Sequence, residues 1–247
     1  MNVLDFTIVL PAFVAGLAVL STHIPFGVQI LNRGVIFADL AIAQFAALGV
    51  LVAELSGMGD TMMMQPIAAS GALCGAAVLA WIERRMPDLQ EAGIGLTFVL
   101  TASLGILLMS QDTHGGEQLK NLLAGQILWV SDLQVIAAIA LAAALLLLWR
   151  LLGQRSGSFG FYALFALAVT ASVQLVGIYL VFASLIVPAL ATHKIKQHRM
   201  LVAGLVGTSG YAAGLLVSVW VDLPAGPAIV WTLALSGILA MLRTFRI

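Results

Sequence analysis

The residue best placed to do chemistry is an aspartate inside an otherwise apolar stretch. Asp39 stands between residues 34–38 and 40–43, which carry no other polar side chain, so its carboxylate falls within a predicted membrane span. A carboxylate in hydrocarbon costs about 2.5–3.5 kcal/mol even on mild insertion scales, and by default it indicates a function. Arg33 lies six residues away, about 600° around a helix, which weakens a local ion pair. Two interpretations stay open: Asp39 lines a transport or gating path, or it is a structural carboxylate at the membrane rim.

A second polar side chain, Gln44, follows Asp39 by five residues, about 140° around a helix. The two side chains can converge on one ion only if the helix is irregular there. The face that Asp39 does share holds Ala43, Ala46 and Ala47, and such small residues favour close packing against another span. Gln44 is therefore a candidate metal ligand only in an irregular helix.

The loop at residues 111–117 gathers an imidazole and two carboxylates within six residues. They are Asp112, His114 and Glu117, and two glycines between them would let the backbone fold inward. Imidazole and carboxylate together suit first-row divalent ions. Two interpretations again stay open: transient metal capture by these three side chains, or a plain solvated loop.

The elements that must position these residues are membrane helices. The 247 residues are 62% apolar and only 9% charged, whereas a soluble domain carries about a quarter charged residues. Cys74 is the only cysteine, which excludes a disulfide scaffold, and a formal net charge of zero argues against nucleic acid as a partner. We therefore predict an all-α polytopic protein embedded in the lipid bilayer, with residues 1–247 forming a single transmembrane domain.

Apolar stretches of about 20 residues, the length that crosses the hydrocarbon core, predict about nine spans. They are residues 6–24, 35–55, 62–82, 93–110, 131–149, 159–175, 177–192, 200–221 and 226–242. The pair from 159 to 192 leaves about 17 residues per crossing, the lower limit. One of that pair could be a re-entrant half-helix, which is tolerated where protein or a water-filled cavity covers its backbone.

The basic residues predict the orientation. Ten of the eleven, all except Lys120, fall in alternate connections and can lie on one side. Such a bias marks the cytoplasmic side. With nine spans, the N-terminus is expected outside and the C-terminus inside.

Nothing in the sequence predicts an enzyme. No pairing of a nucleophile with a base is visible, and the phosphate-binding pattern G-x-x-x-x-G-K-[ST] does not occur. Any ATP hydrolysis would therefore come from another polypeptide.

Five segments resemble, in order, motifs of the ABC-3 permease family, the membrane subunits of zinc/manganese-type ABC importers. They are residues 33–50 around Asp39, 90–95, 123–132, 176–192 and 222–228. Residues 176–192 are similar to the signature V-G-x-x-L-V-x-A-L-L-I-x-P-A-A-x-A, and residues 222–228 are similar to D-x-P-x-G-P-x. The order of the five segments and the last two motifs make the resemblance specific.

The resemblance implies a homodimeric permease of the bacterial inner membrane that moves a divalent metal, zinc or manganese, by alternating access. Separate cytoplasmic ATP-binding subunits would drive transport, and an extracytoplasmic solute-binding protein would deliver the ion. No tightly bound cofactor is expected, because the metal is the substrate. Asp39 would be the counterpart of the intramembrane aspartate that is thought to belong to the family's metal path.

Two departures from the family pattern qualify this expectation. Ala43 stands where the family has a histidine, so a site built from carboxylate and imidazole is incomplete. The connection at residues 150–161 is too short for the acidic helix thought to meet the ATPase, so the loop at 193–199 would dock it instead, or coupling is altered. The alternative function is a permease-like channel, secondary carrier or membrane assembly protein that is not coupled to an ATPase.

Overall fold

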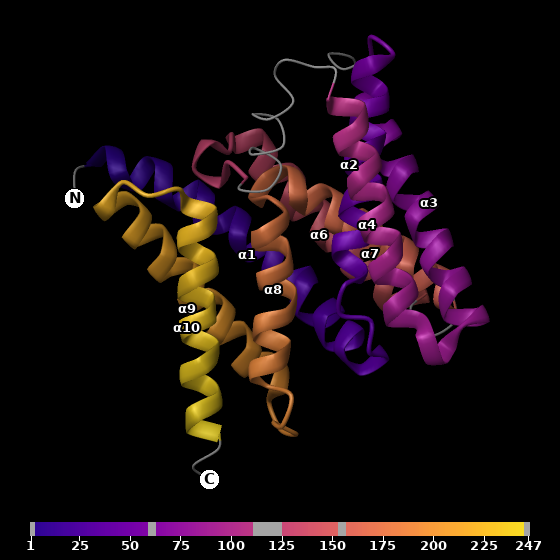
Figure 1. Ribbon diagram of the computed structural model, residues 1–247. Coiled ribbons are helices and arrows are strands. Elements are labelled where there is room, and N and C mark those ends of the chain that lie inside the picture. The colour runs from indigo at the N-terminus through magenta and orange to yellow at the C-terminus, as the bar shows by residue number, and fades with distance from the viewer. Residues whose placement is uncertain (1–2, 59–62, 111–124, 153–156, 245–247) are drawn as a thin grey trace. The chain divides into compact units, whose positions relative to one another are not determined.

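The computed structural model describes residues 3–58, 63–110, 125–152 and 157–244, and these residues are helical, without β-strands (Figure 1). The α-helices of this described part are α1 (Val3–Arg33), α2 (Ala38–Leu55), α3 (Met64–Arg85), α4 (Gln90–Met109), α6 (Asp132–Leu152), α7 (Gly157–Val176), α8 (Ile178–Ala191), α9 (Arg199–Val221) and α10 (Ala225–Thr244). Two 3-10 helices accompany them, η1 (Pro87–Leu89) and η2 (Ile127–Trp129). The predicted all-α polytopic class is confirmed.

Eight of these helices are long and apolar enough to cross a membrane, and the exception is α8. With 14 residues, α8 is about 21 Å long, shorter than the hydrocarbon core of about 30 Å. Only Gly177, with φ of 80°, separates it from α7. The structure thus confirms that residues 159–192 form two helices with a turn at Gly177. The orientation in the membrane stays a prediction.

The first helix is longer than predicted. We expected a span over residues 6–24, but α1 continues to Arg33 through Pro11 and Pro25. Its 31 residues correspond to about 46 Å, more than a bilayer core requires without tilting. Two polar residues beyond the predicted end or close to it, Thr22 and His23, are buried. His23 lies within the helix, with Nδ1 2.9 Å from the Val19 carbonyl oxygen.

The chain divides into two compact units. The first unit comprises Met1–Arg33, Leu123–Ala144 and Ser172–Ile247, and its core is made by α1, α8, α9 and α10. Small residues allow its helix backbones to meet. A Cβ on Gly27 of α1 would overlap the carbonyl oxygen of Leu185 in α8, and a Cβ on Gly214 of α9 would overlap the backbone of Ile229 in α10. Such glycine contacts are typical of helices that pack in membranes.

Two polar contacts also cross between helices of the first unit. The hydroxyls of Ser184 in α8 and Tyr211 in α9 lie 2.8 Å apart in the core. Thr232 Oγ1 of α10 donates to the Gly210 carbonyl oxygen of α9 at 2.7 Å. The buried hydroxyls of Ser184 and Tyr211 and the partly buried hydroxyl of Thr232 therefore all have hydrogen-bond partners inside the unit, as buried polar groups generally do.

Gly125, which precedes η2, allows the backbone there to contact the backbone of the α7–α8 turn. Gly125 has φ of 67°, a conformation in which residues with a side chain are rarely found. A Cβ there would overlap the Val176 carbonyl group. The segment that leads into η2 thus lies directly against the turn from which α8 begins.

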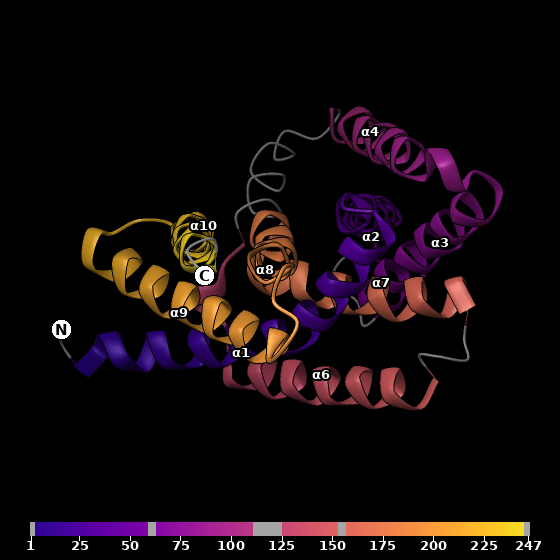
Figure 2. The same cartoon turned by 90° about the horizontal axis from the view of Figure 1, so that it is seen from below.

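The second unit comprises Gly34–Leu122 and Leu145–Ala171. In it α2 packs against both α3 and α4, and the three helices lie together in Figure 2. The α2–α3 contact is again made by glycines, because a Cβ on Gly49 would lie 2.8 Å from the Ile67 carbonyl oxygen, and a Cβ on Gly71 would lie 2.5 Å from that of Phe45. The chain reverses between successive helices, so α2 and α4 begin at the same end of this unit.

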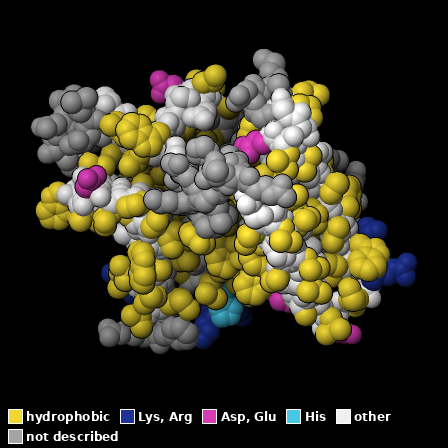
Figure 3. Space-filling model, turned by 45° about the horizontal axis from the view of Figure 1, so that its top comes forward, with side chains coloured by type: hydrophobic (Ala, Val, Ile, Leu, Met, Phe, Trp, Pro, Cys, Tyr) yellow, Lys and Arg dark blue, Asp and Glu magenta, His cyan; other side chains and the backbone are white. Residues whose placement is uncertain are grey.

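Apolar side chains cover most of the face shown in Figure 3. On α4 the exposed residues include Leu96, Val99, Leu100, Leu104 and Leu107. Tryptophans are exposed near helix ends, with Trp220 89% and Trp129 79% accessible. Such a surface suits contact with lipid, since tryptophan is enriched at the membrane–water interface.

Candidate functional site

Asp39 lies in the first turn of α2, which follows a tight turn. Gly34 adopts a positive φ of 69°, and the Ala38 N–H donates to the Val35 carbonyl oxygen at 3.1 Å. The turn ends α1 at Arg33 and starts α2 at Ala38. A carboxylate in the first turn interacts favourably with the positive end of the helix dipole. The Asp39 side chain is nevertheless buried, with only 1% of its surface exposed.

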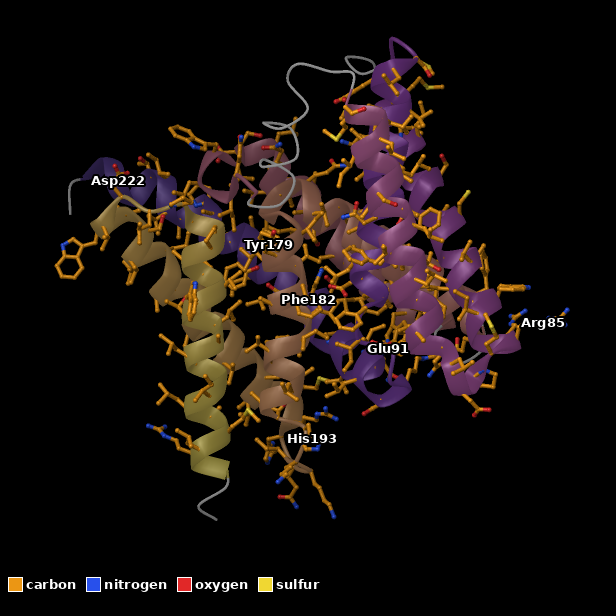
Figure 4. The ribbon with its side chains drawn as sticks, in the orientation of Figure 1. Arg85, Glu91, Tyr179, Phe182, His193 and Asp222 are labelled. Atoms are coloured by element: carbon orange, nitrogen blue, oxygen red, sulfur yellow. The ribbon has the colours of Figure 1, made fainter. Side chains whose placement is uncertain are left out.

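Glu91 is the second acid at this end of the unit. The 3-10 helix η1 turns the chain after α3, and Glu91 falls in the first turn of α4. Its Oε1 accepts a hydrogen bond from the Phe37 N–H at 3.2 Å. Since Phe37 is the residue that precedes α2, this contact ties the start of α4 to the start of α2. Figure 4 shows Glu91 on α4, whereas Arg85 projects away at the end of α3.

The two acids stand in the first turns of α2 and α4, which pack against each other. Both oxygens of Asp39 and Oε2 of Glu91 are buried, and no hydrogen-bond partner for them is found among the described residues. The N–H groups of Asp39 and Leu40 lie near the Asp39 carboxylate and partly offset its charge. Buried acceptor oxygens that have no well-formed hydrogen bond among the described residues are unusual in a folded protein, and they indicate a ligand or a proton.

Ala43 lies one turn after Asp39, on the same face of α2. It is buried, with 1% of its surface exposed, and its methyl group cannot act as a ligand. Gln44 is half-buried, and α2 is a continuous α-helix through it. The irregularity that would bring Gln44 round to Asp39 is therefore not present, and these two residues do not share a face.

The predicted ligands Asp112, His114 and Glu117 lie outside the described residues, so metal capture by that loop stays a prediction. Within the part of the chain that the structure describes, no group of three or more His, Cys, Asp or Glu side chains could hold a metal ion. Among the described residues, Asp39 and Glu91 are therefore a pair of acids without a third side chain of these types beside them.

Sequence reasoning missed Glu91 as a member of this site. The signal was present, because the second and fourth spans both begin at the same side of the membrane. Each of them carries an acid in its first turn. Two first-turn acids on neighbouring parallel helices lie at similar depth and can meet. The sequence pattern alone did not show that α2 and α4 are neighbours.

The connection between α8 and α9 is a second candidate functional feature. Its residues 193–198 are exposed except Ile195, and they include the basic side chains Lys194 and Lys196. The Ile195 N–H donates to the Thr192 carbonyl oxygen at 3.0 Å, and Arg199 Nη2 donates to that of Ala189 at 3.3 Å. This basic loop is thus tied to the end of α8. By contrast, only residues 153–156 connect α6 to α7, which leaves no room for a separate helix.

Comparison with known proteins gives consistent matches along the chain. The model of the ABC 3 transport family matches residues 5–156 and 152–244. The manganese transport system membrane protein MntC of Halalkalibacterium halodurans is 27% identical over 227 residues, covering 83% of this chain and 76% of that protein. An uncharacterized membrane protein from the ycf23-apcF intergenic region of Cyanophora paradoxa is 28% identical over 243 residues, covering 89% of this chain and 80% of its own.

Among solved structures, PsaBC from Streptococcus pneumoniae in complex with Fab is similar, with a TM-score of 0.72. The match is 24% identical and covers 94% of this chain and 89% of that chain. At this identity the similarity supports the fold, and it agrees with the polytopic helical architecture described above.

Proposed function

Because the chain belongs to the ABC 3 transport family, we propose that it is the membrane-spanning permease subunit of an ABC importer for a divalent metal ion. Zinc and manganese are the candidate ions, and transport proceeds by alternating access across the bacterial cell membrane. The similarity to a manganese transport system membrane protein supports a metal as the substrate.

The observation that carries this proposal is the buried carboxylate of Asp39. Its two oxygens have no hydrogen-bond partner among the described residues, and its side chain is 1% exposed in a helix apolar enough to span a membrane. Burying an acid in such a place is unfavourable in free energy, so its presence there indicates an ion pathway. Asp39 therefore lines the path of the metal.

ATP hydrolysis belongs to a separate subunit on the cytoplasmic side, and the loop at 193–199 is the proposed docking surface for it. This loop is exposed, basic and tied to α8 by the Arg199–Ala189 hydrogen bond, so a force applied to it reaches α8. An extracytoplasmic solute-binding protein delivers the ion, and two copies of the chain form the complete permease.

A second candidate function is supported by the connection between α6 and α7. Only four residues separate α6 from α7, fewer than a docking helix needs, so a permease-like channel or carrier without an ATPase is the alternative. Purification of the chain in mild detergent distinguishes the two functions. A nucleotide-binding subunit that co-purifies supports the importer, and its reproducible absence supports the uncoupled protein.

The proposed role of Asp39 is tested by the Asp39→Asn variant, which removes the charge and keeps the size. We expect uptake of radioactive manganese or zinc by cells that depend on this system to fall to background. The matched control is Asp132→Asn, since Asp132 is also a first-turn acid but is exposed. Normal uptake by a correctly inserted Asp39→Asn protein would reject the proposed path.

A further inference from the structure

We propose that His23 makes a proton-sensitive hinge in α1, and that α1, α8 and α9 pack as they do here only while the His23 imidazole is neutral. This inference goes beyond the proposed function and concerns a residue of the first unit that the proposed metal path does not use. It follows from how the imidazole is held, where it lies on α1, and which charged groups the neighbouring elements offer.

The imidazole of His23 is held in one protonation form. Its side chain is 1% exposed, and Nδ1 lies 2.9 Å from the Val19 carbonyl oxygen. A carbonyl oxygen only accepts hydrogen bonds, so Nδ1 carries the proton and Nε2 presents a lone pair. Nε2 is buried and has no hydrogen-bond partner among the described residues. A proton on Nε2 would therefore add a buried N–H and a positive charge with no acceptor there.

His23 lies on the face of α1 that meets both neighbouring helices, and these helices also pack against each other. Positions 20, 23 and 27 follow the i, i+3, i+7 spacing of one helix face. The Leu20 side chain lies against Gly207 of α9. Further along the same face, a Cβ on Gly27 would overlap the Leu185 carbonyl oxygen of α8. His23 thus stands where this face of α1 passes from α9 to α8.

A proline weakens the turn of α1 that carries His23. Pro25 lies inside the helix and has no N–H to donate to the Ser21 carbonyl oxygen. One backbone hydrogen bond around His23 is therefore missing, and helices commonly bend at such prolines. A change in how His23 packs therefore acts on a point where α1 already bends easily.

The elements that pack closely against α1 offer no acid to stabilise a charged imidazole. These elements are α8, α9 and η2. Their titratable side chains are Tyr179, Arg199 and Tyr211, and those of α1 besides His23 are Asp5 and Arg33. Asp5, the single carboxylate among them, lies 18 residues before His23, about 27 Å along the helix. Protonation of His23 therefore favours an open arrangement in which water reaches Nε2.

The sign of the pH effect follows from this arrangement. When α1 separates from α8 and α9, His23 meets water and takes up a proton below the ordinary pKa of free histidine, about 6.5. The open form then binds more protons than the packed form, so each pH unit below that value favours it by at most about tenfold. The packing of α1 is thus fully stable above this pH and weakens as the pH falls.

Thermal unfolding of the full chain in lipid nanodiscs at about pH 7.5 and about pH 5 tests the hinge. His23→Asn keeps a side-chain N–H but cannot take up a proton. On acidification we expect the unfolding equilibrium of the unaltered protein to shift toward the unfolded form by about tenfold more than that of His23→Asn. His193→Asn is the matched control, because His193 is exposed, and it should keep the full pH effect. A pH effect of equal size in folded His23→Asn would overturn the proposal.

Hydrogen exchange in the unaltered protein gives a second test that does not depend on a variant that folds. After correction for the intrinsic pH dependence of exchange, the α1 amides around His23 should lose protection at about pH 5, while those of α3 should keep it. Protection of α1 that is the same at both pH values would also overturn the proposal. Both measurements report on the packing of the first unit, so their outcome is separate from whether the chain imports a metal.

Discussion

Two buried polar pairs in this molecule differ in what their partners can offer. In the first unit the Ser184 and Tyr211 hydroxyls lie 2.8 Å apart, and Ser184 also donates to the Leu180 carbonyl oxygen at 2.6 Å. In the second unit Asp39 and Glu91 can only accept hydrogen bonds when ionised, and three of their oxygens have no donor among the described residues. The first pair is complete within the fold, whereas the second becomes complete only with a cation or a proton.

The difference teaches how to separate residues that hold the helices together from residues that serve a ligand. A satisfied hydroxyl pair stabilises the fold by a modest amount, and removing it should weaken the protein. An unsatisfied acid pair destabilises the fold, so removing its charge should strengthen the protein while activity is lost. The sign of the stability change therefore distinguishes the two regions.

The largest effect is expected where the helices of the first unit are in closest contact. The Gly27→Ala variant places a methyl group against the Leu185 carbonyl oxygen, and overpacking of this kind costs about 1–3 kcal/mol. Thermal unfolding in detergent should show a clear loss of stability. Gly204→Ala is the control, because a Cβ there has no atom within 4 Å, and it should be neutral or slightly stabilising. Equal stability of the two variants would show that α1 and α8 are less closely packed than described.

A gain in stability, rather than a loss, is expected when the charge of either acid, Asp39 or Glu91, is removed. Without metal, Asp39→Asn should raise stability by about 1–2 kcal/mol, because an unsatisfied buried charge is removed. Glu91→Gln should raise it less, because Glu91 is only partly buried and its Oε1 already accepts the Phe37 N–H. Saturating Mn²⁺ should reverse this order, since a ligand at 100 times its Kd stabilises the unaltered protein by about 2.7 kcal/mol. Thermal unfolding with and without Mn²⁺ measures both. Destabilisation by both substitutions in metal-free protein would mean that these acids hold the fold together.

The smallest effect is expected for the hydroxyl pair. Tyr211→Phe removes one hydrogen bond between α8 and α9, and such contacts in membrane proteins contribute about 0.6 kcal/mol on average. Ser184 keeps its bond to the Leu180 carbonyl oxygen, so no buried group is left unsatisfied. Stability should fall slightly and metal uptake should stay unchanged. A loss of uptake without loss of stability would show that Tyr211 acts in transport.

Much of the fold was predictable from hydropathy, because backbone groups in lipid must form helices and a bilayer fixes their length. The nine predicted spans correspond to α1–α4 and α6–α10. The end of the first span was not predictable, because Thr22, His23 and Pro25 look like an ending. Thr22 Oγ1 donates to the Val19 carbonyl oxygen, and His23 Nδ1 lies 2.9 Å from the same oxygen. Both contacts stay within the helix, and α1 continues.

The site was predictable only in part. Asp39 stood out because a single acid in an apolar run is visible without knowing any neighbour. Glu91 did not, since an acid at the start of a span looks like an ordinary membrane-rim residue. Its role depends on the contact between α2 and α4 and on its bond to the Phe37 N–H, and no local pattern encodes such a contact between segments 54 residues apart.

The short helix α8 has a mechanical consequence. At one end its turn at Gly177 lies against Gly125, with no room for even a methyl group between them. At the other end the Arg199–Ala189 hydrogen bond attaches the basic loop. The 14 residues of α8 connect these two ends, and Pro188 lies inside the helix close to the loop. A bend at Pro188 therefore changes where the basic loop lies relative to the turn at Gly177.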